Sequence, residues 1–406
     1  MTHVAIVGAG QAGLYVGSTL RQQGFSGRIS LFGNEGQLPY ERPPLSKAYL
    51  LGQSKKDALV LRGEAYYAEQ NIELFTDSPI SAIDSNRKVI ISGSDEIAYE
   101  HLVLTTGTRA RTLAKEVGGM LDGVYSLRSL DDADKIQSAL AQANHVLIIG
   151  GGYIGLEMAA AARKQGLEVT LVEAAPSILQ RVTGQATADF FRQLHRANGV
   201  VLREGIGLKE LVGESRVEHA ILENGETIAT DCVIVGIGAI VNSELAEQAG
   251  IECDNGIKTD DLGRTSVNDI WAAGDCTRFQ LNGHSIRLES VQNAIEQATR
   301  VAQNILGANL AYQPKPWFWS DQYDVKLQIA GLQQGHNNVV TRPGEKPGHA
   351  QSHWYYRDQQ LLAVDVINEP RTYMIAKRLL EMEKSPDPVL IADPSADLKP
   401  LIKRGT

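Results

Sequence analysis

Two segments of this 406-residue chain repeat the same order of a short apolar run, a glycine-rich turn and an alanine-rich stretch. They read VAIVGAGQAG from Val4 and VLIIGGGYIG from Val146. This order is typical of the first strand, turn and helix of a dinucleotide-binding βαβ unit. A single match could be an ordinary strand-to-helix connection. Two matches in the same context predict a polypeptide that holds two dinucleotides and passes electrons between them.

The three glycines of each turn have different expected tasks. The first allows the tight turn, the second lets backbone N–H groups approach a pyrophosphate, and the third lets the helix pack close to its strand. The phosphates would lie at helix N-termini, where unpaired N–H groups and the helix dipole favour negative charge. The glycines are Gly8, Gly10 and Gly13 in the first turn, and Gly150, Gly152 and Gly155 in the second.

An acidic residue is expected about 20 residues after each turn, at the end of the second strand. In VTLVEAAP it is Glu173. A carboxylate here accepts both ribose hydroxyls of NAD and repels the 2′-phosphate of NADP, and Ala174 and Ala175 supply no arginine for that phosphate. We therefore expect the second site to prefer NADH over NADPH. In ISLFGNE the equivalent position is Gly33, and the nearest carboxylate, Glu35, comes two residues later.

Composition narrows the class of protein. Hydrophobic residues make up 43% of the chain, and no apolar run approaches the roughly 20 residues that a membrane helix needs. The formal net charge of −9 argues against nucleic acid as the main partner. The first predicted strand already starts at Val4, so we expect no targeting leader and a cytoplasmic location.

The cysteines exclude one neighbouring class of enzyme. Cys232, Cys253 and Cys276 lie far apart, and none forms the closely spaced pair of a dithiol/disulfide centre. We interpret them as small buried hydrophobic residues. In a flavoprotein disulfide reductase the redox cysteines lie near the first nucleotide helix, where this chain reads PYERPPLSKAYL. Electrons are therefore expected to leave the flavin by a route other than a disulfide.

Further segments occur in a fixed order along the chain: PYERPPLSK, GGGYIGLE, WAAGDC, LESVQNA and PWFWSDQYDVKLQIAGL. Together they closely resemble the FAD-dependent, NADH-using ferredoxin reductases of bacterial oxygenase systems, the family of putidaredoxin reductase and the biphenyl dioxygenase reductase. The resemblance covers essentially the whole chain. The glycine turns and the AGD element are shared by the glutathione-reductase superfamily, whereas RPPLSK combined with PWFWSDQ is narrower.

The resemblance implies an α/β fold with two Rossmann-like dinucleotide-binding domains and an α/β C-terminal domain. FAD would lie at the Gly8 turn and NADH at the Gly150 turn. Electrons would pass from NADH through FAD to a small [2Fe–2S] ferredoxin, which feeds a cytochrome P450 or an aromatic-ring oxygenase. We expect an FAD-binding domain at residues 1–111 and 240–315, an NAD-binding domain at 112–239 and the C-terminal domain at 316–406. A strand near residues 269–273 and helices near 289–306 and 372–382 belong to this scheme.

The RPPLSK loop supplies a candidate cation for the flavin. The isoalloxazine becomes anionic when it accepts a hydride, so a fixed cation nearby stabilises it. In the family the lysine of this motif, here Lys47, lies beside the flavin and pairs with the glutamate that ends GGGYIGLE, here Glu157. The helix dipole would also favour Glu157 near its helix start. Arg42 is expected to contact FAD, and Tyr153 to cover the flavin until nicotinamide displaces it.

Other contacts also come from the resemblance. Asp275, after a strand and at the start of a helix, would meet the ribityl and pyrophosphate region of FAD, although an aspartate there is also a good helix N-cap. Val291 would present its backbone to the pyrimidine end of the flavin. Trp319 would pack beside the isoalloxazine, whereas Trp317 and Phe318 are interpreted as core or interface residues. Thr106, Gly107 and Arg109 complete the expected FAD contacts, and Ile154 and Gly238 the expected NAD contacts.

One further departure from the family pattern concerns the GxGxxPN element, where Val241 stands in place of proline before Asn242. It touches no group that does chemistry. No metal site is expected, because the nine histidines are scattered without HxH or HExxH spacing.

The electron acceptor is the open question. Such ferredoxins are usually acidic, so we expect a local basic patch despite the negative net charge; Arg287, Arg300, Lys315 and Lys326 are its candidates. A rubredoxin reductase shares the fold and flavin chemistry and remains an alternative. A protein like apoptosis-inducing factor would need basic surface and targeting segments. The sequence leaves open whether the protein is a monomer or a homodimer.

Overall fold

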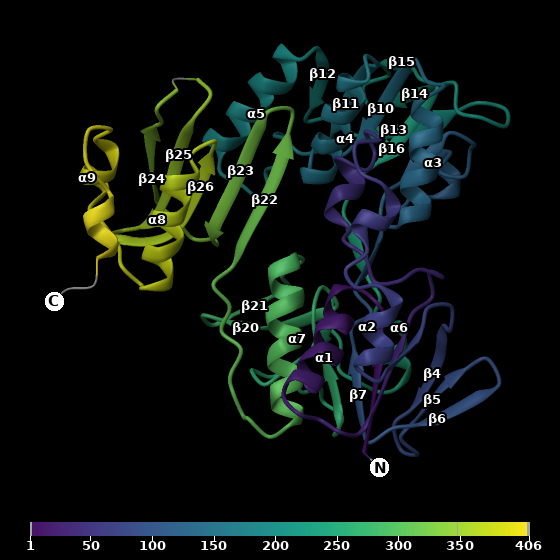
Figure 1. The fold of residues 1–406 in the computed structure, drawn as a ribbon. Helices are drawn as coiled ribbons and strands as arrows, with labels where there is room; N and C mark the ends of the chain where they lie inside the picture. Colours follow the sequence, from purple (N-terminus) through teal and green to yellow (C-terminus); the bar gives the residue numbers. More distant parts are fainter. Residues whose placement is uncertain (1, 347, 404–406) are drawn as a thin grey trace. The chain divides into compact units, whose positions relative to one another are not determined.

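The computed structural model describes residues 2–346 and 348–403. The contacts between its residues divide the chain into two compact units, and each unit is assembled from several separate segments (Figure 1). The first comprises Met1–Arg42, Lys55–Arg109 and Ala239–Pro314, and the second comprises Pro43–Ser54, Ala110–Gly238 and Lys315–Thr406. The chain therefore enters and leaves the first unit more than once.

The first unit is built on a parallel five-stranded sheet with the order β19-β7-β1-β2-β3. Its strands are β1 (His3–Val7), β2 (Arg28–Phe32), β3 (Ile72–Phe75), β7 (His101–Leu104) and β19 (Ile270–Ala272). Every residue of β1 is buried, which explains its uninterrupted apolar sequence. Helices α1 (Gln11–Gln22) and α7 (Val291–Ile305) lie side by side against this sheet (Figure 1).

The second unit contains a parallel sheet of the same design, with the order β12-β11-β10-β16-β9. Its strands are β9 (Val124–Ser126), β10 (His145–Ile149), β11 (Glu168–Glu173), β12 (Val200–Glu204) and β16 (Cys232–Val235). Helix α4 (Tyr153–Lys164) follows β10 as α1 follows β1, and α3 (Leu130–Leu140) and α5 (Gln185–Ala197) complete this part. The glycine-turn strand is central in both sheets, as expected for two Rossmann-like halves.

The repeat extends beyond the glycine turns. In each unit a three-stranded antiparallel sheet follows at the same point of the sequence, after the third parallel strand counted from the strand that precedes the glycine turn. In the first unit this is β4 (Ile80–Asp84), β5 (Val89–Ser92) and β6 (Asp95–Ala98). In the second it is β13 (Leu208–Val212), β14 (His219–Leu222) and β15 (Thr227–Ala229). The internal duplication thus covers two whole nucleotide-binding folds.

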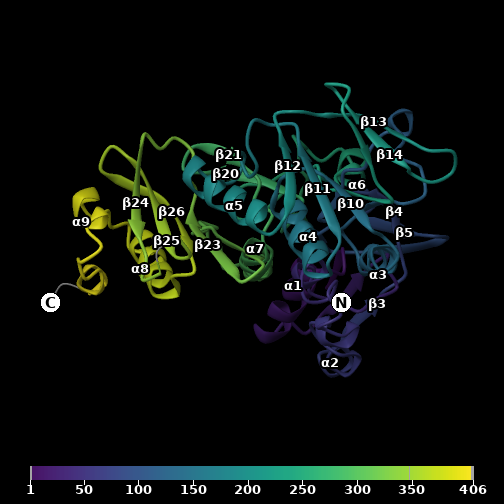
Figure 2. The same cartoon turned by 90° about the horizontal axis from the view of Figure 1, so that it is seen from above.

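The C-terminal part of the second unit is an antiparallel sheet with the order β22-β23-β26-β25-β24. Its strands are β22 (Trp317–Gln322), β23 (Val325–Gly331), β24 (Asn338–Pro343), β25 (Gln351–Arg357) and β26 (Gln360–Ile367). Helix α8 (Pro370–Glu381) packs on β23 and β26, and α9 (Pro388–Ala392) on β24 (Figures 1 and 2). Trp354 and Tyr356 lie fully buried in its core. The predicted α/β fold with a C-terminal α/β domain is confirmed.

Short elements connect these sheets. They are the 3₁₀ helices η1 (Pro43–Ser46), η2 (Lys56–Leu59), η3 (Lys115–Val117) and η4 (Lys399–Ile402), the helices α2 (Glu64–Glu69) and α6 (Glu244–Gln248), and the strands β8 (Thr108–Ala110), β17 (Ala239–Val241), β18 (Ile257–Lys258), β20 (Thr277–Leu281) and β21 (His284–Ile286). Within residues 2–346 and 348–403, no helix is long and apolar enough to cross a membrane.

One local prediction is wrong. No helix begins at Asp275; the residue lies in a turn between β19 and β20. The segment from Thr277 alternates buried and partly exposed or exposed residues and pairs with β21, which is the pattern of a strand. Asp275 is therefore not a helix N-cap, and the next helix, α7, begins at Val291.

Candidate functional site

The two glycine turns have the same backbone geometry. Gly8 has φ of +115° and Gly150 has φ of +107°, a region that side-chain-bearing residues rarely adopt. A Cβ atom on Gly8 would lie 2.2 Å from the carbonyl oxygen of Thr105, and one on Gly150 would lie 2.4 Å from that of Gly236. Each first glycine is thus required both by conformation and by the neighbouring strand.

The other glycines of the turns separate into a packed pair and an open pair. A Cβ on Gly13 would meet the Gly8 carbonyl oxygen at 2.1 Å, and one on Gly155 would meet that of Gly150 at 2.0 Å. At Gly10 and Gly152, by contrast, a Cβ would find nothing within 4 Å. Both of these residues are helix N-caps, and no side chain accepts a cap hydrogen bond from the first turn of α1 or α4. This cradle fits a pyrophosphate at each turn.

Glu173 ends β11 beside the second turn, and its carboxylate is oriented by backbone. Oε2 accepts a hydrogen bond from the N–H of Gly151 at 2.6 Å, and Oε1 accepts one from the N–H of Ala175 at 2.7 Å. Each carboxylate oxygen retains further acceptor capacity. The carboxylate is therefore fixed at the edge of the Gly150 turn, in a position suited to ribose hydroxyls.

Sequence reasoning drew attention to Ala174 and Ala175 but missed Arg181, in the loop after β11. Its Nη2 lies 4.0 Å from the position that a Cβ on Gly238 would take, and Gly238 follows β16 with φ of +103°. An arginine thus reaches the carboxyl end of the second sheet after all. Its sequence neighbours carry no motif, so only the fold brings it there.

In the first unit, Glu35 and Arg42 form one cluster with Tyr40. Arg42 Nη2 lies 2.5 Å from Glu35 Oε1, and its Nη1 donates to the Tyr40 hydroxyl at 3.0 Å. The Tyr40 hydroxyl donates to Glu35 Oε2 at 2.5 Å. Asp275 is close enough to Arg42 to contribute to its electrostatics. Three expected FAD contacts, Glu35, Arg42 and Asp275, are therefore brought to one region.

Thr106, Gly107 and Arg109 lie where the chain leaves the first unit, against the segment that returns to it. The Thr106 hydroxyl donates to the Asn242 carbonyl oxygen at 2.6 Å, and the Asn242 amide donates back to the Thr106 carbonyl oxygen at 2.9 Å. Arg109 contacts the Asn242 side chain at 2.8 Å and forms an ion pair with Glu244. These contacts join the segment that leaves the first unit to the segment that returns to it.

The second unit contains a nearly enclosed ion pair. Lys47 Nζ lies 2.7 Å from Glu157 Oε2, as the resemblance led us to expect, and the Glu157 side chain is only 4% exposed. The Ser46 hydroxyl donates to the same oxygen at 2.5 Å. The Ser320 hydroxyl, from β22, donates to Oε1 at 2.6 Å. Both oxygens of the carboxylate thus accept hydrogen bonds, which offset the free-energy cost of burying its charge away from water.

A chain of buried polar side chains continues from Ser320, and sequence reasoning missed it. Gln322 Nε2 donates to the Ser320 hydroxyl at 3.1 Å, and Gln322 Oε1 lies 2.8 Å from His195 Nε2 in α5. The Tyr323 hydroxyl lies 3.3 Å from His195 Nδ1. Burial lowers the pKa of His195 to about 4, so the imidazole is neutral at pH 7. PWFWSDQ was a visible motif, but its letters do not reveal these partners.

Aromatic side chains gather where α4 meets β22. The Tyr153 ring lies 4.5 Å from that of Phe318, centroid to centroid, and the Trp317 and Trp319 rings are 5.6 Å apart. Lys377 Nζ lies 4.8 Å from the centre of the Trp317 ring. Burial holds the pKa of Tyr153 well above its usual value. The neighbouring Ile154 side chain is 45% exposed.

A second buried carboxylate joins α5 to the C-terminal sheet. Asp365 Oδ2 accepts hydrogen bonds from the hydroxyls of Thr187 and Tyr355, both at 2.7 Å. The N–H of Gly184 in turn donates to the Tyr355 hydroxyl at 3.2 Å. Burial raises the pKa of Asp365 to about 6. None of these residues carried a sequence signal.

The cysteines are unreactive thiols, and most of the candidate docking cations form ion pairs. All three cysteines are free, and burial raises the pKa of Cys232 to about 12 and that of Cys253 to about 11, so neither is a reactive thiolate. Of the candidate cations, Arg287 pairs with Glu289, Lys315 with Glu383 and Lys326 with Asp321. Among the described residues, no cluster of side chains could hold a metal ion.

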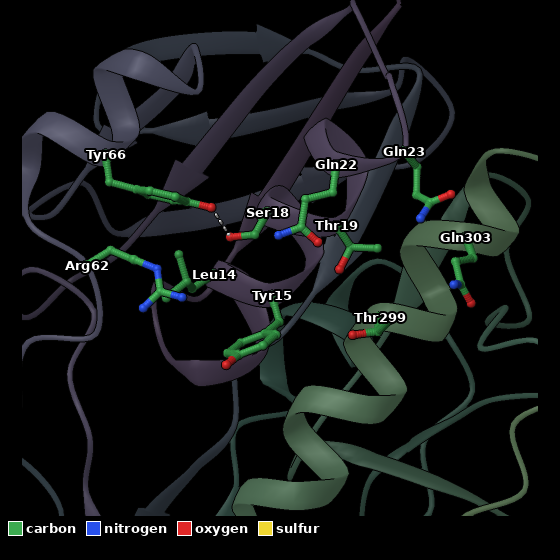
Figure 3. Close-up of a pocket in the computed structure, with 10 residues that line it drawn as sticks. All are labelled: Leu14, Tyr15, Ser18, Thr19, Gln22, Gln23, Arg62, Tyr66, Thr299 and Gln303. Carbon is green, nitrogen blue, oxygen red and sulfur yellow. Dashed lines mark hydrogen bonds between the residues drawn. The ribbon is translucent and has the colours of Figure 1, made fainter.

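A cavity of about 170 Å³ lies in the first unit, apart from the residues above (Figure 3). It is lined by polar side chains of α1 and α7 and by Arg62 and Tyr66, whose hydroxyl donates to the Ser18 hydroxyl at 2.9 Å. None of the expected cofactor contacts lines it. Its lining residues are Leu14, Tyr15, Ser18, Thr19, Gln22, Gln23, Arg62, Tyr66, Thr299 and Gln303.

Comparison with known families agrees with this geometry. Residues 2–298 match the pyridine nucleotide-disulphide oxidoreductase family, and residues 317–402 match the reductase C-terminal domain. The chain is 40% identical to rhodocoxin reductase of Rhodococcus erythropolis, over 99% of this chain and 94% of that protein. It is 39% identical to a rubredoxin-NAD(+) reductase of Pseudomonas putida, over 91% of this chain and 96% of the relative.

Solved structures show the same likeness. The crystal structure of a ferredoxin reductase from Rhodopseudomonas palustris matches with a TM-score of 0.96 at 39% identity, over 99% of this chain and 100% of that one. Putidaredoxin reductase, in its covalent complex with putidaredoxin, matches with a TM-score of 0.94 at 38% identity, over 99% and 98% of the chains. The chain is therefore an oxidoreductase that belongs to the pyridine nucleotide-disulphide oxidoreductase family, and within it to the ferredoxin reductases of bacterial oxygenase systems.

Proposed function

We propose that this protein passes electrons from NADH through FAD to a small [2Fe–2S] ferredoxin that serves a cytochrome P450 or an aromatic-ring oxygenase. When bound, FAD would take a hydride from NADH and release the two electrons one at a time. The observation that carries the proposal is the duplicated fold with two matching glycine cradles, one in each unit. The free, protonated cysteines support exit of the electrons to a separate carrier.

We assign FAD to the turn of Gly8, Gly10 and Gly13. The cradle at this turn supports the assignment, together with the cluster of Glu35, Arg42 and Asp275 in the same unit. Arg42 would bring a fixed positive charge to the dinucleotide, and the N–H groups of α1 would bind its pyrophosphate. The other residues assigned to FAD are Lys47, Thr106, Gly107, Arg109, Val291 and Trp319.

We assign NADH to the second turn, with Glu173 as the ribose-binding residue. The two backbone donors that orient this carboxylate support the assignment, because they hold its charge where a 2′-phosphate would have to lie. This charge favours NADH over NADPH. Arg181 lies near Gly238 and would contribute positive charge for the pyrophosphate. The other residues assigned to NADH are Gly150, Gly152, Tyr153, Ile154, Gly155, Glu157 and Gly238.

Lys47 and Glu157 are the residues we place closest to the chemistry. A lysine held by a buried carboxylate is fixed in position, and its charge would stabilise the negative charge that a hydride brings to the isoalloxazine. Tyr153 would cover the reacting face until nicotinamide arrives. Trp319 would shield the ring from solvent, and its half-buried position in β22 is compatible with that role.

The acceptor is proposed from the relatives. Putidaredoxin reductase has been crystallised in a covalent complex with putidaredoxin, which supports a ferredoxin partner here. The rubredoxin-NAD(+) reductase relative supports rubredoxin as the second candidate. Arg300 stays a candidate docking residue, whereas the ion pairs of Arg287, Lys315 and Lys326 with carboxylates reduce the positive charge these residues offer to a partner.

We retain three domains as a proposal: FAD-binding at residues 1–111 and 240–315, NAD-binding at 112–239, and C-terminal at 316–406. The separate family matches at 2–298 and 317–402 support the last boundary. A cytoplasmic location is proposed as well, because NADH is produced there. The protein would act as a monomer or a homodimer.

A direct experiment tests this function. The purified protein should show the yellow absorption spectrum of bound FAD, which bleaches when NADH is added without oxygen and bleaches far more slowly with NADPH. The reduced protein should then reduce members of a panel of [2Fe–2S] ferredoxins faster than rubredoxins. Faster reduction of rubredoxins would select the alternative acceptor, and a protein that binds no FAD would contradict the proposal.

A further inference from the structure

The carboxylate of Glu157 is held by three donors from two parts of the second unit. Lys47 and Ser46 contact Oε2 and come from η1 and the residue after it. Ser320 contacts Oε1 and comes from the C-terminal sheet, 163 residues along the chain from Glu157. Oε1 has no other donor among the described contacts. Ser320 is thus the group that decides how the carboxylate is rotated toward Lys47.

We propose that Ser320 is a positioning residue for the Lys47–Glu157 pair, and that Gln322 and His195 set the direction of its hydrogen bond. The inference rests on the proposed function, in which Lys47 acts beside the flavin. It assigns the C-terminal strand β22 a second task, which is to hold the acidic partner of Lys47 through Oε1, the oxygen that the RPPLSK loop does not contact.

The direction of the hydrogen bonds follows from donor and acceptor chemistry. A glutamine amide has one acceptor oxygen and one donor nitrogen. Gln322 Oε1 faces His195 Nε2, so the imidazole donates, and Gln322 Nε2 then donates to Ser320 Oγ. The Tyr323 hydroxyl donates to His195 Nδ1, which completes the assignment of the neutral imidazole. Every bond in the chain therefore points toward Glu157.

This order leaves the Ser320 hydroxyl with one role. Its oxygen already accepts from Gln322, so its single proton is directed at Glu157 Oε1. Ser320, Gln322 and His195 are all fully buried, and water cannot replace a missing partner without rearrangement. Hydrogen bonds to a charged acceptor are among the stronger ones in proteins. The loss of this bond would leave Glu157 free to rotate and Lys47 less firmly placed.

The chain offers a matched control for a serine-to-alanine change. Ser352 is also buried in the C-terminal sheet, and its hydroxyl accepts a hydrogen bond from Trp354 Nε1 at 2.9 Å. Among the described hydrogen bonds, none joins Ser352 to Glu157. Ser352→Ala therefore measures how much unfolding free energy is lost when a buried serine hydroxyl is removed from this sheet. Any further effect of Ser320→Ala is attributed to its hydrogen bond with Glu157.

The first measurement is a double-mutant cycle on unfolding by denaturant, with Ser320→Ala and Glu157→Met, a change that removes both acceptor oxygens. We expect the two changes to be non-additive by about tenfold or more in the unfolding equilibrium constant, as for a hydrogen bond to a charged group. Ser352→Ala and Glu157→Met should be additive. Additive effects for Ser320 and Glu157 would overturn the inference.

The second measurement is the flavin midpoint potential, which a purely structural serine would not move. Lys47→Met should lower it, because a cation that stabilises the reduced form is lost. Ser320→Ala should lower it in the same direction but less, and only when Glu157 is present. Ser352→Ala should leave it unchanged. A potential that Ser320→Ala does not move, or that it moves equally in the Glu157→Met background, would overturn the inference.

A second variant covers the case in which Ser320→Ala does not fold. Gln322→Met keeps the side-chain length but removes the donor to Ser320, and it should shift the potential in the same direction by a smaller amount. An unchanged potential in this variant would also contradict the inference. A protein that binds no FAD overturns the proposed function itself, whereas a flavoprotein whose potential ignores Ser320 and Gln322 overturns this inference alone.

Discussion

Lys47 Nζ lies 2.7 Å from Glu157 Oε2, although the two residues are 110 positions apart in the chain. The loop that carries Lys47 belongs to the same compact unit as the helix that carries Glu157, and not to the unit of the preceding Arg42. The pair is therefore part of the framework of the second nucleotide-binding fold, and its residues can be tested separately from the FAD cradle.

Removal of the Lys47 charge should lower both the unfolding free energy and the rate at which NADH reduces the flavin. Lys47→Met leaves the Glu157 carboxylate buried without its cation, which typically costs about 3–5 kcal/mol of unfolding free energy for a buried pair. Glu157 is 4% exposed and Lys47 18% exposed, so solvent screens the pair little. We expect NADH to reduce the flavin of this variant about 10²-fold more slowly, as when one electrostatic stabiliser is removed. Stopped-flow measurement of flavin bleaching provides the test.

A control for this variant is Lys56→Met. Lys56 is exposed in η2, so the same loss of charge and side-chain type should change neither the unfolding free energy nor the reduction rate. Equal effects of the two substitutions would show that the ion pair has no special role.

Replacement of Glu173 should relax the choice between the two nicotinamide cofactors. Glu173→Ala removes the charge that would repel a 2′-phosphate and the acceptor for the ribose hydroxyls. We expect the ratio of kcat/KM for NADH to that for NADPH to fall by about 10- to 100-fold, the usual effect of losing a hydrogen-bonded charged group. Steady-state kinetics with both cofactors measure this ratio.

Glu168, exposed at the other end of β11, provides the comparison. Glu168→Ala should leave the ratio unchanged. If Glu173→Ala keeps the wild-type preference for NADH, the ribose-binding role of Glu173 is wrong.

Alanine at the two later glycines of the second turn should have different effects, one on stability and the other on NADH affinity. A Cβ on Gly155 would lie 2.0 Å from the Gly150 carbonyl oxygen, so Gly155→Ala should destabilise the fold by more than about 3 kcal/mol. A Cβ on Gly152 meets no protein atom within 4 Å, and its backbone angles suit alanine. Gly152→Ala should therefore keep its thermal stability within about 1 kcal/mol and lose affinity for NADH.

Thermal denaturation and NADH titration of the two variants make the comparison. Gly10→Ala is the equivalent change at the first turn and should lose FAD with the fold intact. Normal NADH affinity in Gly152→Ala would mean that no pyrophosphate approaches this backbone.

Asp365 should give the protein a measurable pH dependence. Its pKa is raised from 3.8 to about 6 by burial, so the folded state keeps this proton to a higher pH than the unfolded chain. Between about pH 4 and pH 6 the folded state binds more protons at Asp365 than the unfolded chain does. The contribution of Asp365 to the free energy of unfolding therefore falls as pH rises through this window, by about 3 kcal/mol in total. The sign is opposite to that of an ion-paired aspartate.

Asp365→Asn cannot titrate but can still accept hydrogen bonds from Thr187 and Tyr355. We expect its unfolding free energy, measured with denaturant from pH 4 to pH 7, to lack this fall. Asp324→Asn, at an exposed position of the same domain, should follow the wild-type profile. If Asp365→Asn keeps the wild-type slope, Asp365 ionises like an ordinary carboxyl group in the folded protein.

Local patterns predicted a large part of the architecture. The apolar runs at Val4 and Val146 became the central strands β1 and β10, and the helices expected near residues 289–306 and 372–382 are present as α7 and α8. These predictions succeeded because strand and helix periodicities depend on neighbouring residues. The segment after Asp275 failed because a helix was assumed by analogy, whereas Thr277–Leu281 has the alternation of a strand.

The site divides in the same way. The tasks of Gly8, Gly150 and Glu173 depend on a turn and the strands beside it, and their geometry could be anticipated. The partners of Glu157 could be predicted only in part. The family resemblance predicted Lys47, but no pattern in the sequence predicted the hydrogen bonds of Ser320 and His195. Arg181 and Asp365 carried no signal either. The cofactor roles of all these residues stay predictions until they are measured.

The amino-acid sequence by itself therefore determined that this protein has two dinucleotide-binding halves, an acidic residue, Glu173, about 20 residues after the second glycine turn and no closely spaced pair of cysteines. These properties follow from residue types at short, regular spacing. The tertiary structure alone decided that Ser320 completes the environment of Glu157 and that three of the candidate docking cations are paired with carboxylates. Such contacts join distant segments, and only the packing of the sheets and helices brings their side chains within hydrogen-bonding distance.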